Sequence, residues 1–334
     1  YEANIKNCYL TVGGHENEDC AYNQYVLKSR DSFDNFWAMS SQFCYEGVLL
    51  ENSYKTFYSK LCFDCRDTYF SFDCRNCSNV FGCSGLRHKR YYIFNKPVSK
   101  EEFEKFLKEN PLSSFQNTEA SRKRVQEFFK SVPQRASFID KSVNATGNFI
   151  KESKNCHDCW NVEKCEDLEF GFFDLELKDS FDATSIWKTE LAYDSMGGIT
   201  SSNIKFSVGF LDECRNLEYC NLTFNCQDCF GCLNMRTKSY CILNKQYSKE
   251  EYAVLVKKIK KHMDDVPFKD EKDRVWKYGE FFPYALSSFS YLETVANEYF
   301  PLTATEVKGY GFNEGEYVSG ESYQFSEYPI PDDI

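Results

Sequence analysis

The feature that most constrains the fold of this chain is an internal duplication. The segment Cys77–Cys83, with the run SGLRHKRYYIFNKPVSKEEFEKFL after it, returns 149 positions later as Cys226–Cys232 and LNMRTKSYCILNKQYSKEEYAVLV. Upstream the match continues at a spacing of 148 positions, where Asp31–Asp34 falls on Asp179–Asp182. The chain therefore carries two copies of one module, and its fold has to be one that can be formed twice in tandem.

Each copy contains a shorter period of twelve residues, marked by a ladder of small or apolar side chains. The ladder positions are Cys8, Cys20, Ser32 and Cys44 in the first copy and Cys156, Leu168, Ser180 and Ala192 in the second. An acid or an amide commonly precedes a ladder residue, and an aromatic residue often follows it. Because the ladder residues share small size or apolarity rather than chemistry, we expect them to stack inside a narrow coil, where cysteine serves as a small hydrophobic residue.

Twelve residues are enough for two short strands and two turns, and stacked coils of that size form a β-solenoid. The alternative is an antiparallel β-meander with a hairpin every twelve residues. Hairpin turns favour Asn-Gly or Asp-Gly pairs, which the repeats lack. We therefore predict a mainly β protein with helical caps, built from two tandem short-rung β-solenoid-like modules.

Each copy ends in a predicted closing strand followed by a helix. Ser99 with Glu102, and Ser248 with Glu251, form the capping-box pattern of a helix start. A helix in that place would cover the open end of a solenoid, whose strand edges are otherwise unpaired. We expect a first β module with its closing helix at 1–110, a helical linker at 111–150 with a helix near 118–131, a second β module with its closing helix at 151–265, and an aromatic, acidic C-terminal segment at 266–334 with a short helix near 287–299.

The segments KNCYL, DCRNCSNVFGC and YGEFFPYALSSFSYLETVANEYFPL, together with the two duplicated runs, resemble one family of cysteine-rich, internally duplicated, uncharacterised proteins. We associate that family with uncultured bacterial lineages and large viruses, and the resemblance covers most of residues 1–308. Its members often carry zinc-ribbon-like cysteine pairs beside this region, which this chain lacks, so the resemblance implies a central piece. The family has no established activity, so the resemblance implies a structural protein and adds no catalytic residue.

Metal binding is the sharpest chemical hypothesis. Cys62, Cys65, Cys74 and Cys77 form two C-x2-C pairs with zinc-like spacing, and four thiolates can bind zinc tetrahedrally. In the second copy, Leu and Thr stand at the equivalents of Cys62 and Cys74, so the same site is not repeated there. We therefore predict no metal and no cofactor, treat the cysteines as stacked small residues, and keep a zinc-binding module as the alternative.

No catalytic set is visible in the sequence. The acid pair Asp31 and Asp34 recurs as Asp179 and Asp182, and this repetition indicates turn residues rather than one active site. Paired carboxylates on a β-solenoid can also cleave polysaccharides, so a polysaccharide-binding or polysaccharide-cleaving solenoid is the second alternative.

Composition limits the partners and the compartment. Lys and Arg number 40 against 51 Asp and Glu, and the net charge of −11 argues against nucleic acid as a partner. No apolar run is long enough to span a membrane. Seventeen cysteines cannot all pair within one chain, so we expect mostly free thiols in a reducing, cytoplasmic compartment or in a virion. The chain does not begin with Met, which leaves secretion open.

Aromatic residues are abundant, with 31 Phe, 23 Tyr and 4 Trp, and such residues suit protein interfaces. The run from Gly309 to Ile334 holds six acids and no Lys or Arg, which predicts a solvated tail. We expect a non-enzymatic structural or protein-interaction scaffold, such as a component of a virion or another large assembly. A chain of this kind should self-associate or bind a larger protein assembly.

Overall fold

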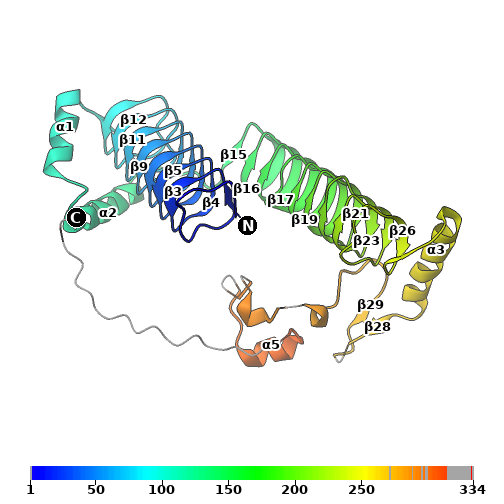
Figure 1. Ribbon diagram of the computed structural model, residues 1–334. Coiled ribbons are helices and arrows are strands. Elements are labelled where there is room, and N and C mark those ends of the chain that lie inside the picture. The colour runs from blue at the N-terminus through cyan, green and yellow to red at the C-terminus, as the bar shows by residue number, and fades with distance from the viewer. Residues whose placement is uncertain are drawn as a thin grey trace. The chain divides into compact units, whose positions relative to one another are not determined.

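The computed structural model describes residues 2–270, 272–287, 289–294, 296–297, 300–313 and 332. The chain divides into two compact units, Tyr1–Arg135 with Gln324–Ile334, and Ala136–Tyr323. Each unit contains one coiled stack of short strands (Figure 1), so each copy of the duplicated sequence forms its own module.

The first module is a β-solenoid in which most consecutive strands alternate between two sheets, one of six strands and one of eight. Strands that pair lie twelve residues apart in sequence, as where Cys20 is in register with Ser32. A short antiparallel pair, β13 with β14, closes the stack. The strands are β1 (Glu2–Ala3), β2 (Gly14–His15), β3 (Glu18–Ala21), β4 (Gln24–Leu27), β5 (Arg30–Phe33), β6 (Phe36–Met39), β7 (Gln42–Tyr45), β8 (Val48–Glu51), β9 (Tyr54–Phe57), β10 (Lys60–Phe63), β11 (Arg66–Tyr69), β12 (Ser78–Phe81), β13 (Arg90–Ile93) and β14 (Lys96–Pro97).

The second module repeats this architecture in one thirteen-stranded sheet, again with parallel pairing and a closing antiparallel pair, β26 with β27. Its first strands are longer because they run on around the coil. The strands are β15 (Ile139–Asp140), β16 (Val143–Lys151), β17 (Lys154–Glu163), β18 (Glu166–Phe172), β19 (Lys178–Trp187), β20 (Glu190–Ile199), β21 (Ser202–Lys205), β22 (Val208–Leu211), β23 (Arg215–Glu218), β24 (Asn221–Phe224), β25 (Gln227–Phe230), β26 (Ser239–Ile242) and β27 (Lys245–Gln246).

The predicted ladder lies in the interior of the coils. Cys156 is in register with Leu168, and Leu168 with Ser180. Seven of the eight ladder residues are buried, and Cys8, in the first coil, is half-buried. The solenoid prediction is confirmed, and the antiparallel meander is wrong, because the stacked strands pair in parallel.

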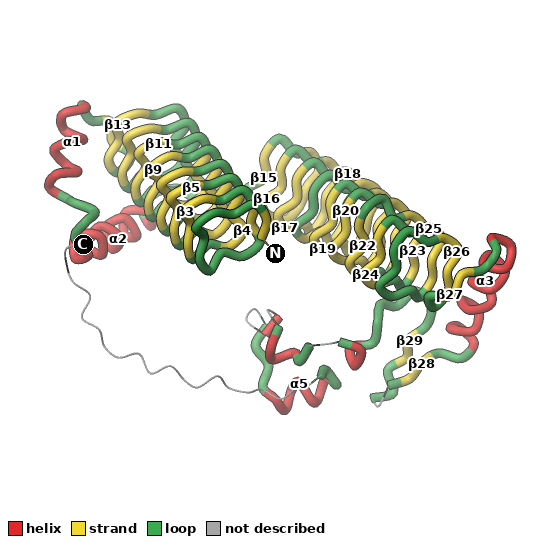
Figure 2. Tube along the Cα trace, viewed as in Figure 1, coloured by secondary structure: helices red, strands yellow, loops and turns green. Residues whose placement is uncertain are grey.

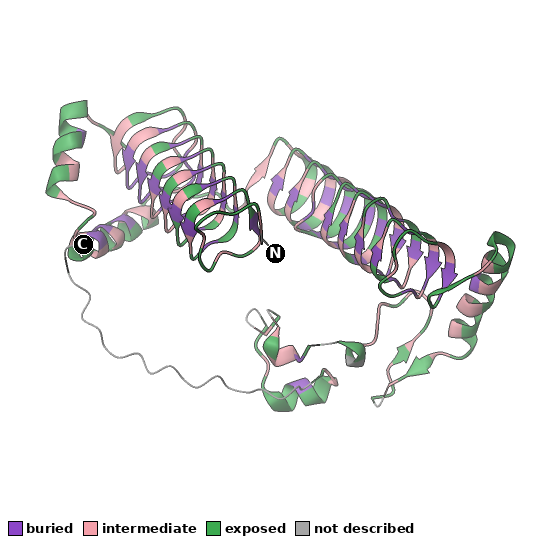
Figure 3. Cartoon of the chain, in the orientation of Figure 1, coloured by how far each residue is buried: buried purple, intermediate pink, exposed green. Residues whose placement is uncertain are grey.

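A period of three residues, which was not predicted, underlies the twelve-residue coil. Asp19, Tyr22 and Tyr25 have positive φ angles of 54°, 57° and 56°, and the residue after each of them is buried. A left-handed residue at every third place turns the chain, so each coil sends four side chains inward along most of both stacks. Figure 3 shows the buried residues recurring regularly along each stack.

Polar side chains also line the interior, although the ladder predicted only small or apolar ones. The amide oxygen Oδ1 of buried Asn23 accepts hydrogen bonds from the main-chain N and the Nδ2 of Asn35, at 2.9 and 3.1 Å. The Nδ2 of Asn35 also donates to the carbonyl of Cys44 at 3.1 Å. These buried amides are tolerated because each polar atom finds a partner in the adjoining coils.

One coil of the second module has an extra residue. Ser202 pairs with Arg215, thirteen positions on, and both Asp212 and Glu213 have a φ of 61°. The additional left-handed residue sits at a turn, so the columns before and after it stay in register. This insertion explains why the two copies match at a spacing of 148 before it and 149 after it.

Helices cover the last coils of each module (Figure 2). Helix α1 (Lys100–Glu109) begins at Ser99 and α3 (Lys249–Asp265) at Ser248, each with the expected capping box. The first module has a second helix, α2 (Phe115–Lys130). Apolar side chains of these helices pack on aromatic residues of the closing strands, so the helices cap both stacks.

The module boundary lies earlier than the expected linker of 111–150 implies. Within that range α2 is helical, whereas residues from Ile139 onward form β15 and β16, the first coil of the second module. The bulge at Gly147 interrupts the twelve-residue period there, and this hid the coil in the sequence.

The C-terminal segment contains short elements only, within the residues that the structure describes. These are β28 (Phe268–Lys269), β29 (Val275–Trp276), the 3-10 turns η1 (Tyr284–Leu286) and η2 (Tyr291–Glu293), and α5 (Ala304–Tyr310). The helix expected near 287–299 is wrong as a continuous helix, because Thr294 is extended directly after η2. The predicted solvated tail falls largely on 314–331 and 333–334, which lie outside the described residues. No helix in the described ranges is long and apolar enough to span a bilayer.

Candidate interaction surface

The cysteine side chains of this protein are free thiols enclosed in the coils. All seventeen are unpaired, and sixteen are buried. The thiol of Cys20 donates to the carbonyl of Glu18 at 3.3 Å and to that of Ser29, in the next coil, at 3.5 Å. Burial raises the pKa of Cys20 to about 11 and that of Cys44 to about 12, so these thiols are neutral and unreactive at physiological pH.

The four cysteines of the zinc hypothesis lie together in two successive coils of the first module. Cys62 and Cys74 are fully buried, and Cys65 and Cys77 are nearly so. Hydrogen bonds from the Cys62 thiol to those of Cys65 and Cys74, together with burial, raise its pKa. The thiol of Cys65 also reaches the carbonyl of Cys74, at 3.4 Å. Across the described part of the chain, no group of three or more His, Cys, Asp or Glu side chains is arranged to hold a metal ion.

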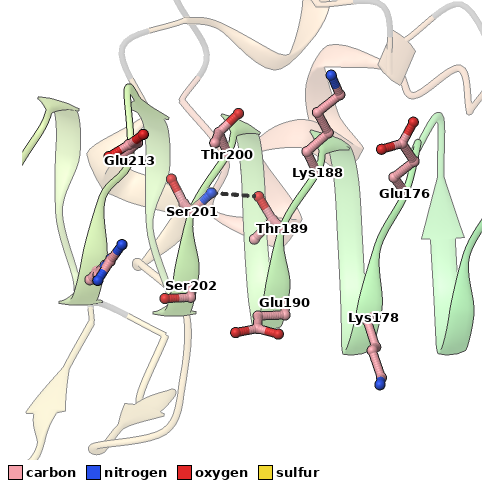
Figure 4. Close-up of a pocket in the computed structure, with 10 residues that line it drawn as sticks. Glu176, Lys178, Lys188, Thr189, Glu190, Thr200, Ser201, Ser202 and Glu213 are labelled. Atoms are coloured by element: carbon pink, nitrogen blue, oxygen red, sulfur yellow. Dashed lines mark hydrogen bonds between the residues drawn. The ribbon is translucent and has the colours of Figure 1, made fainter.

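A shallow depression of about 590 Å³ lies on a corner of the second module (Figure 4). Its floor contains Thr189 and Ser201, where the main-chain N of Ser201 donates to Thr189 Oγ1 at 3.3 Å. Its charged residues alternate in sign along two opposite edges and do not converge on one point. One edge carries Glu176, Lys188 and Glu213, and the other carries Lys178 and Glu190. The depression therefore brings no acid–base pair together for catalysis.

The most distinctive surface is a row of rings on one side of the second module, which we call the aromatic side. The rings of Phe170, Phe181, Tyr193, Phe206 and Tyr219 follow one another along the stack. Successive ring centroids are 5.3, 5.5, 5.5 and 4.8 Å apart. Phe181 and Tyr193 are in register on adjacent strands, whereas Phe170, Phe206 and Tyr219 lie at the left-handed position that follows, so the rings come from two neighbouring outward columns.

Only part of the aromatic side is covered. Phe206 is 3% exposed, whereas Phe170, Phe181 and Tyr193 are 45%, 36% and 42% exposed. The covered part lies under α3 and the segment after it. Lys260 of α3 forms an ion pair with Glu218 at 2.6 Å, and the Tyr278 hydroxyl donates to the same carboxylate at 2.8 Å.

The adjoining side of the second module is also apolar and uncovered. Trp160 is in register with Phe172, and Met196 lies two strands further along the same column. The three side chains are 43%, 57% and 46% exposed. We call this surface the Trp–Phe side. Thr184 lies between Phe172 and Met196 in this column. Large apolar side chains exposed close together mark interaction sites in soluble proteins.

Two carboxylates interrupt the uncovered part of the aromatic side. Asp182 and Asp194 lie on adjacent coils, and neither forms an ion pair within the described residues. Partial burial, followed by the charges of Asp182 and Glu280, raises the pKa of Asp194 to about 6. The aromatic side is therefore apolar with a local excess of negative charge.

The abundance of aromatic residues was evident from the sequence, but the side on which they gather was not predicted. The usable signal was the aromatic residue that often follows a ladder position within two residues, because these two positions lie on one side of the coils. Asp31, Asp34, Asp179 and Asp182 all have left-handed backbones, with φ between 47° and 55°, and this supports their interpretation as turn residues.

No protein-family model matches this chain. No curated protein matches it either.

Solved structures with some likeness include three acyl-transfer proteins. A proposed acetyltransferase from Desulfovibrio desulfuricans G20 is 10% identical over 72% of this chain, with a TM-score of 0.12, and the match spans 57% of that protein. The UDP-N-acetylglucosamine acyltransferase from Campylobacter jejuni is 8% identical over 84% of this chain and 98% of its own, with a TM-score of 0.10. The polySia specific acetyltransferase NeuO is 6% identical to this chain, with a TM-score of 0.08. The match covers 78% of this chain and 96% of that protein. TM-scores this low carry no argument about activity.

Proposed function

We propose that this protein is a non-enzymatic, protein-interaction scaffold that self-associates within a larger assembly. The observation that supports it is the Trp–Phe side, where Trp160, Phe172 and Met196 expose large apolar side chains in one column of a regular stack. Large apolar and aromatic residues of this kind are the ones that dominate binding energy in interfaces.

A repetitive stack suits such a role because each coil rests only on its neighbours, and a row of equal positions presents the same chemistry at regular intervals. The backbone of the Trp–Phe side is held in place by the buried columns beneath it. A backbone that is ordered before binding lowers the entropy cost of association.

Sedimentation equilibrium of the full chain tests this function. We expect the wild-type protein to exceed its monomer mass of 39.1 kDa as concentration rises. We expect Phe172→Asp to return it towards the monomer, because a carboxylate would be desolvated in the interface. Lys178→Asp is the matched control. It introduces the same aspartate at an outward position six residues away, which lies on a different side of the stack from Phe172. A monomeric wild type, or equal loss in both variants, would contradict the proposal.

A further inference from the structure

The duplication allows the same surface to be compared in both modules. At the spacing of 148 positions, Tyr45, Glu46 and Tyr58 of the first module correspond to Tyr193, Asp194 and Phe206 of the second. The ring stacks agree as well. Tyr58 stacks on its neighbour Phe70 at 4.6 Å, and Phe206 stacks on its neighbour Tyr219 at 4.8 Å.

In the first module this surface is occupied by α2. The guanidinium of Arg122 lies 2.9 Å from the carboxylate of Glu46 and 5.1 Å from the ring centroid of Tyr58. Further along the helix, Val125 is buried and the ring of Phe128 contacts Phe94 at 5.3 Å. An amphipathic helix thus places one cation between a carboxylate and a ring, with apolar side chains beyond it.

In the second module no helix takes that place within the described residues. The chain leaves α3 for β28 and β29, and the ring of Tyr278 then covers Phe206 at a centroid distance of 6.1 Å. The same segment brings Glu280 near Asp194, which adds negative charge where the first module has Arg122. Asp194, the equivalent of Glu46, therefore has neighbouring carboxylates and forms no ion pair among the residues that the structure describes.

We propose that the uncovered aromatic side, at Phe181, Asp182, Tyr193 and Asp194, binds an amphipathic helix of a partner protein that carries an arginine or lysine among apolar residues. This inference rests on the proposed scaffold function and names the chemistry of its partner. Charge complementarity selects a cationic segment, because Asp182 and Asp194 lie side by side without an ion-pair partner in the described structure. The exposed rings select apolar side chains around that cation.

The mode of docking is one that this chain already uses in both modules. Lys260 of α3 combines an ion pair to Glu218 with a position 4.6 Å from the ring centroid of Tyr278, which belongs to the segment after α3. Arg122 combines Glu46 with Tyr58, and both of these residues belong to the coils. A cation held between a carboxylate and an aromatic face is favoured because both partners attract it, and the half-buried setting reduces competition from water.

A labelled peptide with the sequence of α2 and its cap, residues 114–131, is the probe, and fluorescence anisotropy with the full chain is the measurement. We expect saturable binding, weakened about tenfold by Asp194→Asn, because a charge-assisted hydrogen bond is lost. Asp179→Asn is the matched control and should leave binding unchanged. Asp179 and Asp194 have φ angles of 49° and 46°, which asparagine tolerates equally, but Asp179 lies on another side of the coil.

A peptide carrying Arg122→Glu should not bind. Absence of saturable binding by the unmodified peptide, or binding that Asp194→Asn leaves intact, overturns this inference. Binding that Phe172→Asp removes instead would place the helix on the Trp–Phe side and would also overturn it. If the peptide fails while the chain still self-associates through the Trp–Phe side, only this inference is lost. If both measurements fail, the scaffold function is lost with it.

Discussion

Left-handed backbone at every third residue decides which amino acids the coils accept at their turns. Asparagine and aspartate tolerate this conformation better than other residues with a side chain. In the coils they also form ladders: the Nδ2 of Asn155 donates to Asp167 at 2.7 Å, and that of Asn216 to Asp228 at 2.9 Å. The acid or amide before a ladder residue is thus explained by backbone geometry and by contact between coils.

Asp174 is the most unusual residue of the interior. It is 2% exposed, and its Oδ1 accepts a hydrogen bond from the main-chain N of Ile186 at 2.8 Å. Its Oδ2 has no partner within the described structure. Burial raises the pKa of this carboxyl from 3.8 to about 8, so Asp174 is protonated in the folded protein at neutral pH.

This burial predicts a pH dependence of stability. The unfolded chain loses the Asp174 proton near pH 4, whereas the folded chain holds it until about pH 8. The contribution of this group to the free energy of unfolding is therefore complete below pH 4 and falls as pH rises towards 8, by at most about 1.4 kcal/mol per unit. Asp174→Asn should remove that slope while keeping the bond to Ile186. Equal slopes in urea titrations of both proteins between pH 5 and 8 would contradict this prediction.

Residues such as Asp174 and Asn35 could not be predicted from the sequence as interior. Polar side chains are usually outside, and the twelve-residue reading followed only one of the four inward columns. Their burial depends on partners in neighbouring coils, which become visible only when the three-residue period is known.

At the scale of elements, the closing helices were predictable because their start signals are local. In α1, Ser99 Oγ accepts from the main-chain N of Glu102 at 3.1 Å, and the Glu102 carboxylate accepts from the main-chain N of Ser99 at 2.7 Å. The helix near 287–299 was expected from apolar spacing, yet the capping box at Ser290 starts only the single turn of η2. A start signal therefore does not fix the length of a helix.

Removing the cap of α1 should destabilise the end of the first module. We expect Ser99→Ala to lower the free energy of unfolding by about 1 kcal/mol, because it leaves a helix N–H without its side-chain acceptor. Ser99→Thr keeps the hydroxyl and should stay within a few tenths of the wild type. Hydrogen exchange of α1, which packs on the closing strands through Phe103, is the measurement. Unchanged protection in Ser99→Ala would show that packing alone holds the helix.

At the scale of the whole molecule, the reactivity of the thiols reports whether the coils are folded, because the coils enclose nearly all of them. Cys8 is the one cysteine that is not buried, so we expect at most one thiol to react with a disulfide reagent in the native protein and all seventeen in denaturant. A chelator added before the reagent tests the zinc alternative, because thiolates released from a metal would then react. Several fast native thiols, or a chelator-dependent rise, would contradict the assignment of enclosed, metal-free thiols.

The overall architecture could be predicted from the sequence because every repeat gives the same evidence for it. A duplicated module and a twelve-residue ladder each constrain the same coil, and Cys20 and Cys156 occupy matching places in it. What the repeats could not reveal is which outward surfaces stay uncovered. Which surfaces are covered depends on where α2 and the segment near Tyr278 pack, and both lie outside the repeat.

The thirteen-residue coil at Asp212 and Glu213 has a consequence for how such proteins diverge. A single inserted residue is accommodated at one turn, and the strands after it pair again at a spacing of twelve residues. Copies of this kind can therefore differ in length and keep the same packing. A sequence alignment without gaps will match such copies only up to the inserted residue. Homologues of this chain should therefore be searched for by aligning individual coils.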